Sequence, residues 1–288
     1  MSVTESNTIS RPPIGGTSMM FWNRTVEQAV VEAARLGYDA IEVWAEHLWR
    51  DDEDPQRIKR ALAQANLSCT VHCPIMDINV TSPNQGIREE SLRQTLESVD
   101  LCDALGAKLL VVHPGALFSL KDTDRFWDLQ FQALEAIIQH AEKRGVWMAF
   151  EHMETHAKLE VVKCADDIKR ALEPFTYDKL GVTYDTTHLV TTQANLDFIA
   201  AMDNIIHVHL SDAVVEPGGK VRVHLPLGEG VLDIEAILRA LLPTYRGILS
   251  LETYIPAADD TTPVLHEREK VERFLDRVLA GSGEAIVG

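Results

Sequence analysis

The chain has 288 residues, of which 45% are hydrophobic and 25% charged, so its composition is that of a globular protein and excludes a disordered or fibrous one. Its 27 Lys and Arg residues against 44 Asp and Glu residues give a net charge of −17 at pH 7. Such an acidic surface repels phosphate backbones, and no run of Lys or Arg offsets it, which counts against a nucleic-acid partner.

The sequence contains no pattern typical of a membrane span, a signal peptide or a paired-cysteine motif. No stretch approaches the ~18 apolar residues of a membrane span, which predicts no membrane partner, and the polar start MSVTESNTISRPP lacks the apolar core of a signal peptide. The four cysteines form no CxxC pair. We therefore expect a cytoplasmic protein with reduced thiols.

Short apolar runs alternate with amphipathic helical stretches along the whole chain after residue 13. Thr25 with Gln28 is typical of a capping box, and glycines at 37, 106 and 145 stand where helix C-caps belong. The predicted strands are Ile14–Trp22, Asp39–Trp44, Leu67–His72, Lys108–His113, Val146–Glu151, Leu180–Asp185, Ile205–Leu210 and Gly247–Glu252. The predicted helices are Thr25–Leu36, Pro55–Asn66, Ile87–Leu105, Asp124–Arg144, Ala165–Leu172, Leu196–Met202, Ile234–Leu242 and Val264–Leu279.

Eight strand–helix units without a break in composition predict an α/β protein with a single (β/α)8 TIM barrel. The barrel spans 14–280, between a flexible N-terminal tail (1–13) and a C-terminal tail (281–288). A doubly wound open sheet would carry a Gly-rich phosphate loop after its first strand. Gly15 and Gly16 instead precede that strand's end and do not match GxGxxG.

Carboxylates and imidazoles end most of the later strands, and in a barrel these ends meet at one face. Glu151, Asp185, His209 and Glu252 would therefore converge, although they lie far apart in sequence. Converging carboxylates repel one another and lose hydration, and a divalent cation is the simplest compensation. Three carboxylates and one imidazole suit Mn, Mg, Co or Zn, so we expect one such metal and no organic cofactor.

With these residues placed, the chain is similar to the xylose isomerase-like barrel superfamily, which includes sugar-phosphate isomerases and epimerases and endonuclease IV. The resemblance implies that Glu151, Asp185, His209 and Glu252 bind the metal, and that Glu151 and Glu252 also move protons on opposite faces of the substrate carbon. It further implies that His188 hydrogen-bonds a substrate oxygen. The segments that carry it are VHCPIMDINVTSP, LGAKLLVVHPGA, WMAFEHM, GVTYDTTH, HVHLSD, HLPLGEG and ILSLE.

Endonuclease IV binds three zinc ions, and the resemblance matches its additional ligands to His72 and His113 for one ion and to His188 and His224 for another. That enzyme has an Asp two residues before the last His, where this chain has Arg222. The departure argues against the third zinc and against DNA repair. His72 and His113 either hold a second metal or, with His188 and His224, line the substrate pocket.

The remaining features concern the substrate. Trp22 and Trp44 could form aromatic walls for a sugar, and at most one of Glu42 and Glu46 can face the site. Arg222 is a candidate contact for a phosphate or carboxylate. The epimerases' substrate-binding Arg is not matched, because Val214 and its neighbours stand there.

The leading hypothesis is a metal-dependent sugar or sugar-phosphate isomerase or epimerase that abstracts a proton next to a carbonyl and proceeds through an enediolate. The alternatives are a dehydratase of 2-keto-inositol or 3-dehydroshikimate on the same site, a zinc phosphodiesterase and a non-catalytic barrel. The expected ligand is a small sugar or cyclitol, and a homo-oligomer is compatible with the sequence.

Overall fold

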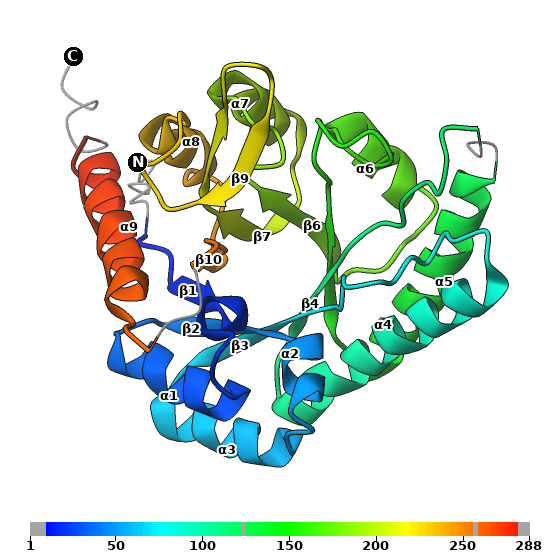
Figure 1. Cartoon of the computed structure of the whole chain (residues 1–288), viewed down its shortest axis with the longest axis horizontal. Coiled ribbons are helices and arrows are strands. Elements are labelled where there is room, and N and C mark those ends of the chain that lie inside the picture. Colours follow the sequence, from blue (N-terminus) through cyan, green and yellow to red (C-terminus); the bar gives the residue numbers. More distant parts are fainter. Residues whose placement is uncertain (1–9, 122–124, 256–258, 282–288) are drawn as a thin grey trace, which may run out of the picture.

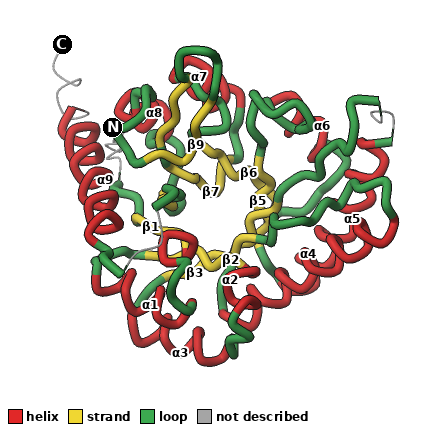
Figure 2. The backbone as a smooth tube through the Cα atoms, viewed as in Figure 1, coloured by secondary structure: helices red, strands yellow, loops and turns green. Residues whose placement is uncertain are grey.

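Eight parallel strands close a barrel in this computed structural model, which describes residues 10–121, 125–255 and 259–281 (Figures 1 and 2). The strand order is β1-β10-β7-β6-β5-β4-β3-β2, and the helices surround the strands, so the predicted single (β/α)8 barrel is confirmed. The strands are β1 (Ile14–Thr17), β2 (Ala40–Trp44), β3 (Ser68–His72), β4 (Leu109–Val112), β5 (Trp147–Glu151), β6 (Leu180–Asp185), β7 (Ile205–Leu210) and β10 (Leu249–Leu251). Most of the predicted N-terminal tail (1–9) and C-terminal tail (282–288) lies outside the described residues.

The helices follow the local signals of the sequence. The Thr25 hydroxyl accepts from the Gln28 amide and the Gln28 side chain accepts from the Thr25 amide, which completes the predicted capping box. Gly37, Gly106 and Gly145 all adopt positive φ at helix ends, as expected of C-cap glycines. The helices are α1 (Val26–Arg35), α2 (Ala45–Arg50), α3 (Pro55–Ala65), α4 (Gln85–Leu105), α5 (Phe126–Arg144), α6 (Ala165–Leu172), α7 (Thr192–Ala201), α8 (Ile234–Leu241) and α9 (Thr262–Gly281).

Several boundaries differ from the prediction. The first strand ends at Thr17 and a 3-10 turn, η1 (Ser18–Phe21), follows it, so Trp22 does not end a strand. The short helix α2 was not predicted. Helix α7 begins at Thr192 rather than Leu196, because the Thr191 hydroxyl caps it by accepting from the Ala194 amide. The predicted start of α5 at Asp124 lies outside the described residues.

An unpredicted hairpin follows β7, formed by β8 (Asp212–Val215) and β9 (Val221–Leu225). The fully buried Asp212 carboxylate anchors the loop after it by accepting from the amides of Gly228 and Gly230 at 3.0 Å each and of Leu232 at 3.1 Å. A Cβ at Gly230 would lie 2.2 Å from Asp212 Oδ1, so the loop requires glycine there. The hairpin thereby carries His224 back toward the mouth of the barrel.

None of the described helices combines the length and the apolar character that crossing a membrane requires.

Candidate metal centre

The four residues predicted as metal ligands meet at the carboxyl ends of adjacent strands; we call them the metal cluster. Glu151 and Asp185 are the last residues of β5 and β6, His209 lies near the end of β7, and Glu252 directly follows β10. Strand pairing places Asp185 beside His209 in register. One potential ligand atom from each residue lies within 4.8 Å of those of the other three.

His209 is the centre of the metal cluster. Its Nδ1 lies 2.8 Å from Glu252 Oε2, 3.2 Å from Glu151 Oε1 and 3.8 Å from Asp185 Oδ2. The side chains of His209, Glu151 and Asp185 are at most 1% exposed, and that of Glu252 is 13% exposed. Three carboxylates thus lie within 4 Å of one imidazole nitrogen in a largely buried site.

Burial and mutual charge act in opposite directions on the pKa values here. Burial disfavours the ionised Glu151 carboxylate, but His209 and His113 outweigh it and hold the Glu151 pKa well below its usual range. Burial also disfavours protonated His209, yet Glu252, Glu151 and Glu42 raise its pKa well above the usual value. The cluster therefore favours carboxylates in their ionised form together with a positive charge among them.

Asp185 is held so that one oxygen faces the cluster. Its Oδ1 accepts from the Thr187 amide at 2.6 Å, the Thr187 hydroxyl at 2.7 Å and the His188 amide at 3.2 Å. Its Oδ2 is buried and accepts no hydrogen bond within the described part of the chain. A buried, unpaired carboxylate oxygen is costly unless a cation satisfies it, so the donor set and this oxygen both fit a divalent metal.

Two further groups border the metal cluster. His113 Nε2 and His72 Nε2 lie 3.0 Å and 3.8 Å from Glu151 Oε2, which makes a three-residue group suited to a second metal. The other group joins Asp185 with His188 and His224. The structure therefore brings together all four histidines that were predicted to line the site.

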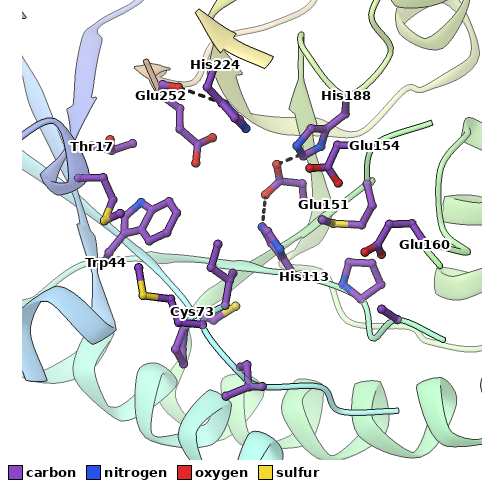
Figure 3. A pocket seen from close by; sticks show the side chains of 18 of the residues that line it. Thr17, Trp44, Cys73, His113, Glu151, Glu154, Glu160, His188, His224 and Glu252 are labelled. Atoms are coloured by element: carbon purple, nitrogen blue, oxygen red, sulfur yellow. Dashed lines mark hydrogen bonds and ion pairs between the residues drawn. The ribbon is translucent and has the colours of Figure 1, made fainter. Parts of the chain in front are cut away.

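The metal cluster opens into a cavity of about 650 Å³ (Figure 3). Glu151 and Glu252 project into this cavity from opposite sides, and His113 and His188 lie beside Glu151. Trp44 stacks on His72 with ring centroids 4.3 Å apart and is almost fully buried, and Trp22 lines the mouth. The cavity thus has an ionisable side and an aromatic side.

Arg222 is not brought to this cavity. It lies in β9 with a side chain that is 51% exposed and forms an ion pair with Glu216 at 3.5 Å. Arg222, which was expected to contact a substrate anion, therefore lies outside the described lining, although His224 of the same strand belongs to it.

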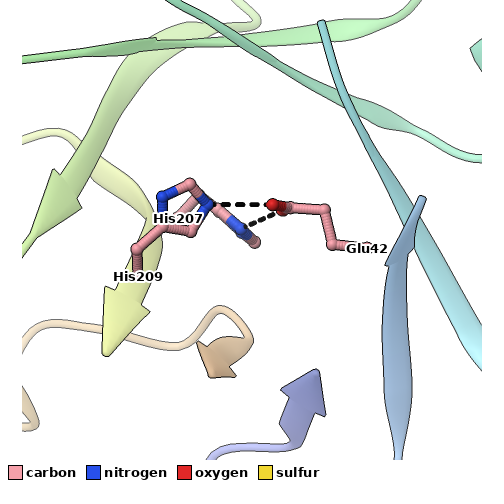
Figure 4. A group of neighbouring side chains, drawn as sticks. All are labelled: Glu42, His207 and His209. Carbon is pink, nitrogen blue, oxygen red and sulfur yellow. Dashed lines mark hydrogen bonds and ion pairs between the residues drawn. The ribbon is translucent and has the colours of Figure 1, made fainter. Parts of the chain in front are cut away.

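Three buried residues support the metal cluster, of which the sequence indicated only Glu42, as one of two candidates, and did not indicate His207 or His152. Glu42 lies beneath His209, with the neighbouring His207 (Figure 4). His152 Nε2 accepts from the Asp185 amide at 3.2 Å, and burial lowers the His152 pKa to about 3, which keeps this ring neutral. The H-x-H spacing of His207 and His209 could have revealed one of them, because alternate strand residues share a face.

A sequence profile described as "Xylose isomerase-like TIM barrel" matches residues 30–274. "Uncharacterized protein MJ1311" of Methanocaldococcus jannaschii is 26% identical over 69% of this chain and 70% of its own length. "Probable endonuclease 4" of Aquifex aeolicus is 24% identical over 60% of this chain and 65% of its own length. "Inosose dehydratase" of Geobacillus thermodenitrificans is 27% identical over 69% of this chain and 67% of its own length.

Solved structures share the fold. A D-tagatose 3-epimerase-like protein superposes with a TM-score of 0.81 at 21% identity, covering 94% of this chain and 99% of that one. The zinc-bound IOLI protein superposes with a TM-score of 0.78 at 16% identity, covering 92% and 99%.

Proposed function

Because the chain belongs to the xylose isomerase-like TIM-barrel family, we propose that it is a divalent-metal-dependent isomerase or epimerase of a small sugar or cyclitol. The observation that carries this proposal is the convergence of Glu151, Asp185, His209 and Glu252, with one Asp185 oxygen left unpaired and buried. The zinc in a structural relative and the epimerases among the others support it. The expected metal is Mn, Mg, Co or Zn, held by these four residues.

The bound metal would polarise a carbonyl and hydroxyl pair of the substrate and make the adjacent C–H more acidic. Glu151 and Glu252 face the cavity from opposite sides. One carboxylate removes the proton from the carbon next to the carbonyl, leaving an enediolate, and the other returns a proton to complete the isomerisation or epimerisation. The two glutamates therefore serve as base and acid as well as ligands.

His188 is oriented to hold a substrate oxygen. Its Nδ1 donates to the His152 carbonyl at 2.6 Å, which leaves Nε2 for the cavity that the ring lines. Burial works against protonation, but Asp185, Glu151 and Glu154 raise the His188 pKa to about 9. Near neutral pH the ring therefore carries both protons, and Nε2 donates a hydrogen bond to the substrate.

The cavity's charge favours an uncharged substrate over a sugar phosphate. Among the described lining residues are Glu154 and Glu160 in addition to the metal cluster, and there is no Lys or Arg. A phosphate group placed there would meet these carboxylates without a Lys or Arg side chain to bind it. We therefore place a neutral ketose or keto-cyclitol ahead of its phosphate ester.

The first experiment is metal content per chain, measured by elemental mass spectrometry on protein purified without added metal or chelator. One equivalent of Mn, Co, Mg or Zn, followed by turnover on a panel of neutral ketoses and keto-cyclitols, is the expected result. A chain that contains no metal and takes none up on titration would contradict the proposal.

A dehydratase is the second candidate, since the inosose dehydratase and 3-dehydroshikimate dehydratase relatives favour it. Proton abstraction beside a carbonyl is common to both reactions, so the same residues serve. Loss of water creates a conjugated product, and a new ultraviolet absorbance on the same substrate panel distinguishes this outcome from isomerisation.

A zinc phosphodiesterase is favoured by one observation, the grouping of His72 and His113 on Glu151. Two or three zinc ions per chain together with nicking of abasic-site DNA would support it. Two features argue against it. Arg222 stands where endonuclease IV has an Asp, and the net charge of −17 repels a phosphate backbone.

A further inference from the structure

Both ring nitrogens of His209 face carboxylates, on opposite sides of the imidazole. Nδ1 points to the metal cluster, with Glu252 Oε2 at 2.8 Å. Nε2 points away from it to Glu42 Oε1 at 2.9 Å (Figure 4). A neutral imidazole carries its proton on one nitrogen only, so a partner that accepts from Nε2 leaves the lone pair on Nδ1.

Glu42 is itself held rigidly. It projects from β2 into the barrel and is 1% exposed. Thr70, its register partner on β3, donates its hydroxyl to Glu42 Oε2 at 3.0 Å, and His207 Nε2 lies 2.6 Å from the same oxygen. Both oxygens of the carboxylate therefore have nearby partners, which lowers the cost of burying its charge.

This arrangement also argues against a cation between Glu42, His207 and His209, although their potential ligand atoms lie within reach of one another. Each Glu42 oxygen already lies within 3 Å of an imidazole nitrogen. The buried oxygens without a hydrogen-bond partner in the described residues include Asp185 Oδ2 and Glu151 Oε2, and both belong to the metal cluster that His209 Nδ1 faces.

We infer that Glu42, supported by Thr70 and His207, is a positioning residue that fixes the His209 ring and its tautomer so that Nδ1 is presented to the metal. The inference rests on the proposed metal dependence and adds to it a residue outside the ligand set. A carboxylate that accepts from the distal nitrogen of a histidine ligand also makes that ligand more basic.

The test is the Zn²⁺ affinity of the full chain, measured by competition with a chromophoric chelator for the wild type and Glu42→Gln. The amide retains the shape of the side chain but loses its charge, and the expected result is a Zn²⁺ Kd raised by about 10- to 100-fold. Glu32→Gln is the matched control: the Glu32 side chain is 14% exposed and pairs with Arg35 at 2.7 Å, and neither residue lines the cavity or belongs to the metal cluster. Its Zn²⁺ Kd should equal that of the wild type.

A second measurement separates positioning from general stability. In ¹⁵N-histidine NMR spectra of the zinc-loaded chain, the His209 ring should be protonated at Nε2 in the wild type, and its Nε2 resonance should shift in Glu42→Gln and in His207→Gln.

If the wild type binds zinc and Glu42→Gln binds it equally tightly, the positioning role is wrong while the proposed function stands. If Glu42→Gln loses one of two zinc equivalents, Glu42 is a ligand and the inference is overturned. A wild type that binds no metal overturns both.

Discussion

The two sides of the cavity are built on different principles. The metal cluster is made of charged side chains at the ends of β5, β6, β7 and β10, where backbone pairing fixes their positions. The lining also contains an apolar wall, which we define as Met19, Trp22, Ile75, Met76 and Ile78. The wall lies outside the barrel strands: Met19 is in η1, and Ile75 and Met76, which are 37% and 50% exposed, are in the loop after β3. Under the proposed function, the strands would fix the chemistry, whereas η1 and the loops would select the substrate.

Removing one carboxylate charge from the metal cluster should give the largest effect. Glu151→Gln and Glu252→Gln leave the volume of each side chain unchanged but remove a proton acceptor. We expect each to reduce proton exchange at the substrate carbon by about 10²- to 10⁴-fold, measured as deuterium incorporation from solvent. Exchange at the wild-type rate in either variant would show that the cluster does not carry the chemistry.

Removing the metal from the metal cluster should lower the stability of the folded chain. A metal at 100 times its Kd stabilises the fold by about 2.7 kcal/mol. For a chain of 288 residues, we expect chelation to lower Tm by roughly 4–5 °C. Calorimetry of the chelated and the zinc-loaded chain measures this difference, and Glu42→Gln should show a smaller shift at equal zinc concentration. Identical Tm values with and without metal would refute the prediction.

The metal cluster lies at strand ends and the apolar wall does not, and this difference explains which residues the sequence could predict. The strand ends follow from hydrophobic period and length, so Glu151, Asp185 and His209 could be placed before any coordinates were available. Glu42 could not be assigned, because the strand pattern does not show what lies behind it, and because Glu46 lies beyond β2 in the unpredicted helix α2. In the structure, Glu42 lies 2.9 Å from His209 Nε2, whereas Glu46 accepts hydrogen bonds from the backbone amides of Ile75 and Met76.

The hairpin β8–β9 and the short helix α2 escaped prediction for a local reason. Both are too short for a periodic signal, and the hairpin depends on buried Asp212, whose partners come from 16 to 20 residues further along the chain. The misplacement of Arg222 follows directly from missing that hairpin. Contacts of this kind belong to tertiary structure and leave no pattern in a short sequence window.

The apolar wall should respond more weakly than the metal cluster. Met76→Ser removes part of an apolar contact surface that is already half exposed, and about 1 kcal/mol of binding, or roughly fivefold in KM, is the expected loss. Because the wall contains no residue of the metal cluster, kcat should stay unchanged. Steady-state kinetics on the substrate found by the panel provides both values, and Arg222→Ala is the control outside the cavity. A large fall in kcat for Met76→Ser would contradict the separation of the two sides.

The smallest expected effect concerns Glu160, a carboxylate of the cavity lining without an ion-pair partner in the described segments. Burial and, secondarily, Glu154 raise the Glu160 pKa to about 7. A raised acid pKa means that folding is favoured while the group is protonated, so this contribution is complete below the unfolded pKa of about 4.5 and is lost as pH rises toward 7.

Glu160→Gln should therefore match the wild-type Tm near pH 4.5 and exceed it slightly at pH 8. Glu32→Gln provides a control of opposite sign, because hydrogen bonding from Arg35 lowers the Glu32 pKa to about 2, and this variant should lose stability at pH 8 rather than gain it. Thermal melts across this pH range distinguish the two directions. If Glu160→Gln is no more stable than the wild type at pH 8, a cation compensates Glu160, and the charged side of the cavity extends beyond the metal cluster.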